Sequence, residues 1–166
     1  MKSGLTIRED NYSVVLDALK QLSGTDVLVG IPAGPPRDDA PLSNAELGYL
    51  QSTGATVEID GDTVTLPPRP FLDMGIEDSR DKTTARLKLA AQAALEGNAG
   101  LAEQHLEAAG QIARDASKAV IGDGDRLTPL SEKTLQRRRA QGLPGDKPLY
   151  AHGFLLRAIN YVVRKK

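Results

Sequence analysis

The sequence has 166 residues, 40% hydrophobic and 26% charged, which predicts one globular domain over residues 1–166 with a modest core. Twenty-one basic residues against twenty-two acidic ones give a net charge of −1, which argues against a protein whose main work is to hold nucleic acid by its phosphates. Cysteine is absent, which excludes disulfides, thiolate metal sites and a cysteine nucleophile.

The N-terminus lacks the basic and apolar regions of a signal peptide, and no apolar run approaches the ~20 residues of a membrane span. We therefore expect a protein that is made in the cytoplasm and does not contact a membrane.

The first predicted helix follows a short extended lead-in, in which Leu5 and Ile7 alternate with polar residues. Asp10 or Asn11 can cap the helix, its apolar residues return at spacings of three and four, and Gly24 stands where a C-terminal cap belongs.

Residues 26–31, Asp-Val-Leu-Val-Gly-Ile, are mostly apolar and β-branched, which predicts a buried strand. The stretch from Pro32 to Pro41 contains four prolines, so it cannot continue the sheet. We expect it to be a mobile surface loop that carries Arg37, a candidate contact with a partner.

A short helix and a β-hairpin are predicted next. Ser43 or Asn44 can cap the helix, which ends near Gly54. Two runs of alternating β-forming residues, 55–59 and 63–66, then flank Asp60 and Gly61. An Asp-Gly pair suits a tight turn that needs positive φ, so we expect a hairpin that can project from the body, with Asp60 at its tip as a candidate partner contact.

A proline-rich corner, Pro67 to Ile76, separates this half of the chain from a helical half. Three prolines up to Pro70 exclude both a helix and a central strand at this point. The apolar residues from Phe71 onward are expected to anchor the corner against the helices. The alternative is an exposed loop that presents Arg69 and Phe71 to a partner.

Two long helices are predicted after the corner, over residues 78–95 and from 102 to about 120, with an interruption at Gly97, Asn98 and Gly100. The apolar residues expected to form a broad face on the first helix are Ala85, Leu87, Leu89, Ala90, Ala93 and Ala94. Those expected to form a packing seam on the second are Ala102, Leu106, Ala109, Ala113, Ala116 and Val120. An alanine seam buries little area, so either neighbouring elements widen it or another subunit covers it.

The C-terminal part predicts a polar helix over residues 131–141, and then a turn or short helix from Leu149 that leads into a strand at 159–163. Residues 164–166 are all basic and are expected to form a tail. The fold class predicted for the whole chain is α+β: a small antiparallel or mixed sheet with a β-hairpin, packed against long α-helices.

No arrangement of residues predicts catalysis, a metal or a cofactor. Asp123 and Asp125 resemble the start of a calcium loop, but the later ligand positions hold Leu127 and Thr134, so a polar turn that ends the helix is the simpler interpretation. Neither histidine lies in a zinc-binding pattern, and neither a phosphate-binding glycine loop nor a serine elbow is present. We therefore do not expect an enzyme.

The densest charge cluster is Arg137, Arg138 and Arg139, with Lys133 one turn earlier. It can be a solvated helix face, a contact to an acidic partner subunit or a contact to nucleic acid.

Several stretches together resemble the tail-completion or neck proteins of tailed bacteriophages, also described as minor tail or virion morphogenesis proteins. They occur in the order found in that family and span most of the chain. The stretches are Val27–Pro32, Asn44–Tyr49 leading to Gly54, Pro68–Leu72, Lys147–Leu149, Gly153–Leu155 and Ala158–Val162. His152 is a departure, because the family more usually has threonine before that glycine.

The resemblance implies a structural protein of the virion without catalytic activity, which joins the finished tail to the DNA-filled head. Similar proteins form rings, usually sixfold, between the tail terminator and the head-closure ring, and genomic DNA passes through the lumen without specific binding. It also implies assembly in the cytoplasm of a host bacterium. The candidate interface residues are Arg37, Asp60, Arg69, Phe71, Arg137, Arg138 and Arg139.

The alternative function is a nucleic-acid-binding accessory protein that uses the Arg137–Arg139 cluster and the basic C-terminal residues.

Overall fold

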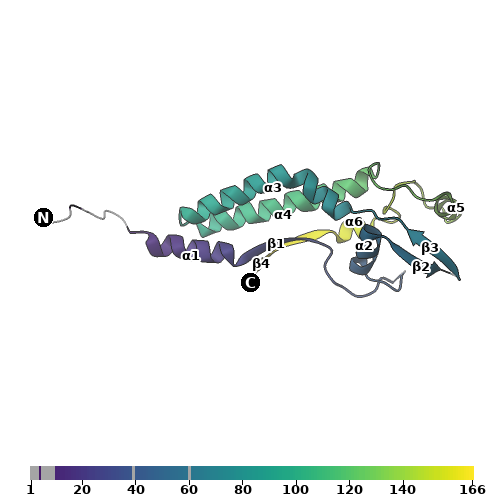
Figure 1. Cartoon of the computed structure of the whole chain (residues 1–166), viewed down its shortest axis with the longest axis horizontal. Helices are drawn as coiled ribbons and strands as arrows, with labels where there is room; N and C mark the ends of the chain where they lie inside the picture. The colour runs from purple at the N-terminus through teal and green to yellow at the C-terminus, as the bar shows by residue number, and fades with distance from the viewer. Residues whose placement is uncertain (1–3, 5–9, 39, 60) are drawn as a thin grey trace.

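Two long antiparallel helices run along most of an elongated molecule, seen in the computed structural model of Figure 1, which describes Gly4 and residues 10–38, 40–59 and 61–166. The lead-in at Leu5 and Ile7 and the candidate contact Asp60 lie outside the described residues. The elements are α1 (Tyr12–Ser23), β1 (Thr25–Gly30), α2 (Asn44–Thr53), β2 (Ala55–Ile59), β3 (Asp62–Leu66), α3 (Phe71–Leu95), α4 (Ala99–Asp123), α5 (Glu132–Ala140), α6 (Phe154–Ala158) and β4 (Asn160–Lys165).

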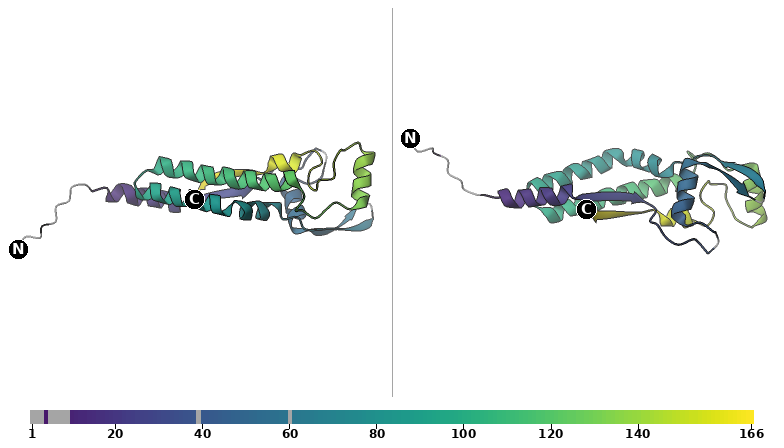
Figure 2. Two further views of the ribbon diagram at one scale, coloured as in Figure 1. Left: turned by 90° about the horizontal axis from the view of Figure 1, so that it is seen from above. Right: turned by 60° about the horizontal axis from the view of Figure 1, so that its bottom comes forward.

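The elements form two layers, as the additional views in Figure 2 also show. Helices α3 and α4 form one layer, and α1 with the β1–β4 pair lies along it as the second. Helices α2, α5 and α6 and the β2–β3 hairpin gather at the end away from α1. The predicted α+β class is confirmed, with two separate antiparallel two-stranded sheets rather than one sheet.

Small residues let α3 and α4 approach closely. Gly75 of α3 lies against the backbone of Ser117 on α4, where a Cβ atom built on the glycine would be 2.3 Å from the Ser117 Cα. The seam predicted on α4 is buried except at Ala116, which is half-buried next to the fully buried Ser117. The apolar face predicted on α3 is confirmed at Ala90, Ala93 and Ala94, which are buried near the end of the helix. The rest of the prediction is wrong, because Ala85, Leu87 and Leu89 are exposed.

Helix α3 begins at Phe71, seven residues before the predicted start at Asp78. Pro70 is its N-cap, and the carbonyl of Pro70 accepts a hydrogen bond from the Met74 N–H at 3.0 Å. Proline is unfavourable inside a helix, but its fixed φ is favourable at the N-terminus, where a helix begins. The proline corner therefore starts the long helix directly.

The β1–β4 pair joins distant parts of the chain. Its register sets Val29 opposite Tyr161 and Leu28 opposite Val162. The Tyr161 ring packs on Gly110 of α4, so the Leu28–Val162 pair, one residue along each strand, lies on the outer face. The strand predicted to be buried is only half-buried, because α4 covers one of its faces.

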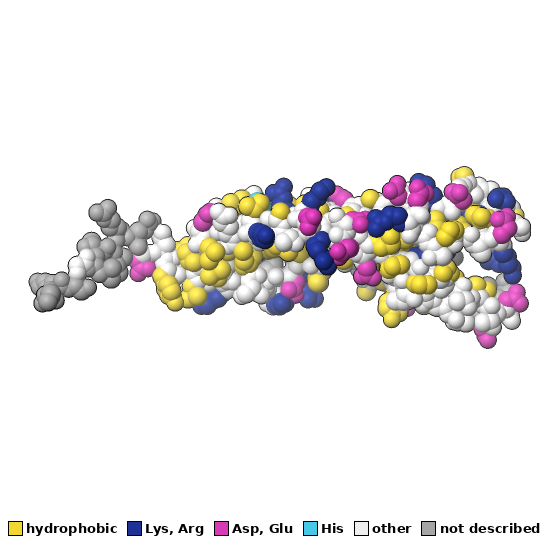
Figure 3. All heavy atoms as spheres, turned by 45° about the horizontal axis from the view of Figure 1, so that its top comes forward, with side chains coloured by type: hydrophobic (Ala, Val, Ile, Leu, Met, Phe, Trp, Pro, Cys, Tyr) yellow, Lys and Arg dark blue, Asp and Glu magenta, His cyan; other side chains and the backbone are white. Residues whose placement is uncertain are grey.

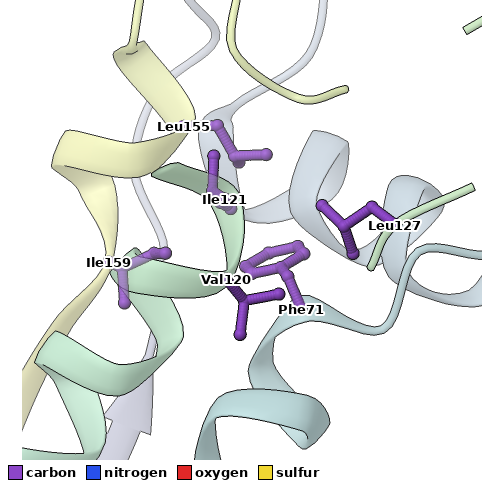
Figure 4. Packing of buried hydrophobic residues seen from close by; sticks show 6 residues of the cluster. All are labelled: Phe71, Val120, Ile121, Leu127, Leu155 and Ile159. Carbon is purple, nitrogen blue, oxygen red and sulfur yellow. The ribbon is translucent and has the colours of Figure 1, made fainter. Parts of the chain in front are cut away.

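The main core lies where α3, α4 and α6 meet (Figure 4). Phe71 is at its centre and is 0% exposed. The other buried members are Val120, Ile121, Leu127, Leu155 and Ile159. A second cluster, built on Ala18, Ala93, Ala94 and Ala102, fixes α1 to the turn between α3 and α4.

The predicted helix and hairpin after the proline-rich loop are confirmed as α2 and β2–β3. Ser43 caps α2 in a capping box: its hydroxyl accepts a hydrogen bond from the Glu46 N–H at 3.2 Å, and Glu46 Oε2 accepts one from the Ser43 N–H at 2.8 Å.

Replacing Ser43 by alanine should therefore lower the free energy of unfolding by about 1 kcal/mol, because one N–H at the start of α2 loses its partner. Urea denaturation would measure the loss. Ser131→Ala removes the equivalent cap of the shorter helix α5 and is the matched comparison. If both variants are as stable as the wild type, the two caps are not formed in solution.

Candidate functional site

A groove of about 420 Å³ opens at the end of the molecule away from α1, between β3 and α5. The corner after β3, the segment between α4 and α5, and the residues before α6 complete its walls. Arg37, Arg69 and Arg138 line it, together with apolar side chains that include Leu66 and Leu130. Three of the arginines singled out from the sequence therefore meet at one place.

Arg69 is buried, with 5% of its surface exposed. Its Nε donates to the Thr128 carbonyl at 2.7 Å, its Nη2 to the Pro129 carbonyl at 2.9 Å and its Nη1 to Gln51 Oε1 at 3.2 Å. Burial, and secondly the charge of Arg138, lowers the pKa of the Arg69 guanidinium below its usual value, although it remains a cation. Arg69 thus holds the α4–α5 segment against the corner.

The corner interpretation of Arg69 and Phe71 is the correct one, and the alternative of an exposed loop is wrong for both. Phe71 lies wholly inside the main core and cannot touch a partner. Arg69 reaches the groove only as part of its wall. The hydrogen bonds to the Thr128 and Pro129 carbonyls hold the Arg69 side chain against the α4–α5 segment, where these carbonyl groups replace water.

The arginine cluster on α5 does not act as one surface. Arg138 points into the molecule, where its Nη1 donates to the carbonyls of Lys147 and Tyr150 at 3.0 and 3.2 Å. Burial lowers the pKa of Arg138. Arg139 pairs with Glu132 at 3.4 Å, and Arg137 is exposed.

Arg37 anchors the proline-rich loop to α6. Its guanidinium lies over the ring of Phe154, 4.6 Å from the centroid, and Arg157 stacks on the same ring at 5.1 Å. Two cations on one aromatic ring stabilise its position by cation–π attraction.

The basic residues at 164–166 are not a free tail. Arg164 lies in β4, and its guanidinium is 3.5 Å from Asp26 on the paired strand β1. Lys166 Nζ is 3.0 Å from the same carboxylate, and the Lys166 N–H donates to the Gly24 carbonyl at 2.7 Å. The hydrogen bond from Lys166, more than that from Arg164, lowers the pKa of Asp26 below 3.8.

The Asp26 carboxyl should therefore titrate below 3.8 in the folded protein. A carboxyl whose pKa falls on folding stabilises the fold above its unfolded pKa and loses that contribution as pH falls through its folded pKa. NMR titration of wild type and Lys166→Gln should show a higher Asp26 pKa in the variant, and Lys165→Gln, at the last residue of β4, is the control. Equal pKa values in wild type and Lys166→Gln would show that the pair is absent in solution.

The turn after α4 ends that helix. Gly124, between Asp123 and Asp125, has a φ of +71° and caps α4 in the left-handed conformation. Arg126 then binds the carboxylate of Asp78 on α3 through both of its terminal nitrogens. Among the described residues, no three His, Cys, Asp or Glu side chains are grouped to hold a metal ion.

No protein-family model, curated protein or solved structure was found to match this chain. Within the described part of the chain, no helix combines the length and apolar character needed to span a membrane.

Proposed function

We propose that this protein is a structural subunit of the neck of a tailed bacteriophage, a tail-completion component that forms a ring, usually of six copies, between the tail and the DNA-filled head. Its partners are the tail terminator and the head-closure or connector proteins. It assembles in the bacterial cytoplasm and becomes part of the virion. The ordered sequence resemblance described above is the starting point of this proposal.

The observation that carries the proposal is that the subunit exposes apolar side chains on two separate surfaces. One lies at the α1 end, where Tyr12, Val14 and Leu95 are exposed near the turn between α3 and α4. Figure 3 shows apolar side chains gathered at that end. The second is the outer face of the β1–β4 pair, with Leu28 and Val162. Two different surfaces on one subunit suit head-to-tail contacts, and such contacts form a ring when the rotation between neighbouring subunits closes.

The test is the mass of the purified protein by light scattering, alone and mixed with tail tubes that lack it, followed by electron microscopy. Rings at the tube end are the expected result, even if the free protein is a monomer. Val162→Asp should prevent ring formation, because it places a charge on the apolar outer face, where Val162 is 52% exposed. Asn160→Asp adds the same charge on the same face at a position that is already polar, and should still assemble.

The alternative, a nucleic-acid-binding accessory protein, has less support from the side-chain contacts. Arg138 and Arg139 contact other groups of this chain, and Arg164 and Lys166 share the Asp26 carboxylate. The neck proposal would be overturned, and the alternative established, by a monomer that does not bind tail tubes but binds DNA at physiological salt with an affinity that falls steeply as the salt concentration rises.

A further inference from the structure

The groove between β3 and α5 is bordered by the unpaired edge of a strand. Among the described residues β3 pairs only with β2. Val64, Thr65 and Leu66 follow one another in β3, and all three line the groove. Successive side chains of a strand point to opposite faces of its sheet. Three consecutive residues can therefore border the same groove only if the groove lies along the edge of the strand. Such an edge carries N–H and C=O groups that can pair with another chain.

The same groove carries the positive charge of two partly buried guanidinium groups, those of Arg69 and Arg138. The hydrogen-bond acceptors of Arg69 and Arg138 described above are all carbonyl or amide oxygens, which carry no net charge. None of the described residues that line the groove is Asp or Glu. Buried charges are normally paired with an opposite charge, so two partly desolvated guanidinium groups in one wall favour an anionic occupant.

Most of the other lining residues are apolar, although Gln51, Thr65, Ser131 and Thr134 also line the groove. Leu47, Leu66, Leu130 and Leu155 line the groove from α2, β3, the α4–α5 segment and α6. Leucine walls suit aliphatic side chains but offer nothing to sugars or bases, whereas nucleic-acid sites combine basic grooves with stacking aromatic rings. The groove therefore favours a peptide over a nucleic acid.

We propose that this groove binds an extended, acidic segment of a partner protein, which adds to the edge of β3 as a third strand and places a carboxylate on Arg138. Main-chain hydrogen bonds to β3 would supply affinity, and the alternate side chains would supply specificity: aliphatic ones against the leucines and an acidic one toward the guanidinium groups. The inference rests on the groove alone and holds whether or not the protein forms a ring.

The probe is a peptide of generic sequence, acetyl-Ser-Val-Glu-Val-Glu-Val-Ser-amide, compared with the same peptide carrying glutamine in place of both glutamates. NMR titration of the labelled full-length protein should show shifts of the Val64–Leu66 backbone amides and of the Arg138 side chain. The glutamate peptide should bind at least about 10-fold more tightly than the glutamine peptide, because ionised hydrogen bonds are the stronger ones.

Arg138→Gln should remove the preference for glutamate, whereas Arg137→Gln, its exposed neighbour on α5, should leave that preference unchanged. Because Arg138 also holds the carbonyls of Lys147 and Tyr150, the loss could come from a disturbed loop. A charge swap tests whether a disturbed loop is the cause. The Arg138→Glu protein should bind a peptide with lysine in place of both glutamates more tightly than it binds the glutamate peptide, which a disturbed loop would not explain.

Four results would overturn the proposal. One is the absence of peptide-induced shifts at β3, and another is equal binding of the glutamate and glutamine peptides. The third is binding of inorganic phosphate at Arg138 when neither peptide shifts the β3 amide signals; the groove would then be a simple anion site. The fourth is self-association that Arg138→Gln abolishes without any peptide binding, which would make a second copy of this chain the occupant.

Discussion

Replacing Phe71 by alanine is expected to lower the free energy of unfolding by about 3–5 kcal/mol, because it truncates the largest fully buried side chain among the described residues. The ring is 0% exposed and packs against Val120, Ile121 and Leu127, so its removal leaves a cavity at the only place where α3, α4 and α6 share a core among the described residues. The loss is comparable to the whole stability of many domains of this size.

Urea denaturation would measure the loss, with Phe154→Ala as the matched control. Phe154 is 41% exposed and contacts Arg37 and Arg157, so its truncation should cost only about 1 kcal/mol. If the two variants lost the same free energy, Phe71 would not be the centre of the core.

Gly75→Ala should destabilise the protein by about 1–3 kcal/mol or more, although alanine is the better helix former by about 1 kcal/mol. The added methyl group would meet the backbone of Ser117, 2.3 Å from its Cα and 2.5 Å from its nitrogen. Backbone atoms cannot rotate away, so α3 and α4 would have to separate along their contact.

Gly122→Ala is the control for that experiment. Gly122 is also helical, but a methyl group there would meet no other atom within 4 Å, so the variant should be as stable as the wild type or slightly more stable. Thermal unfolding of the three proteins would order them Gly122→Ala, wild type, Gly75→Ala. A Gly75→Ala protein as stable as wild type would mean that the two helices are not in close contact.

Elements set by short-range interactions could be predicted from the sequence. Ser43 followed three residues later by Glu46 predicts a capped helix, and an Asp-Gly pair between two runs of β-forming residues predicts the hairpin, although its second strand begins at Asp62 and not at Thr63. In both cases the interacting groups lie within a few residues of each other, so the local pattern contains the cause.

Features decided by distant contacts could not be predicted in the same way. The close approach of Ser117 explains why Gly75 belongs inside α3 instead of in a turn before it. The direction of Arg138 depends on carbonyl groups nine and twelve residues further on. Nothing near Arg69 in the sequence indicates that Thr128 and Pro129 will accept its hydrogen bonds.

The pairing of β1 with β4 sets an order for events during synthesis. Asp26 and Arg164 are 138 residues apart, so β1 leaves the ribosome long before its partner strand has been translated. At about 5–20 residues per second, β1 waits on the order of 10 s without a partner. The α3–α4 hairpin, which depends on neighbouring segments, can fold during that interval. The nascent protein therefore passes through a stage in which Leu28 and Val29 are open to a chaperone.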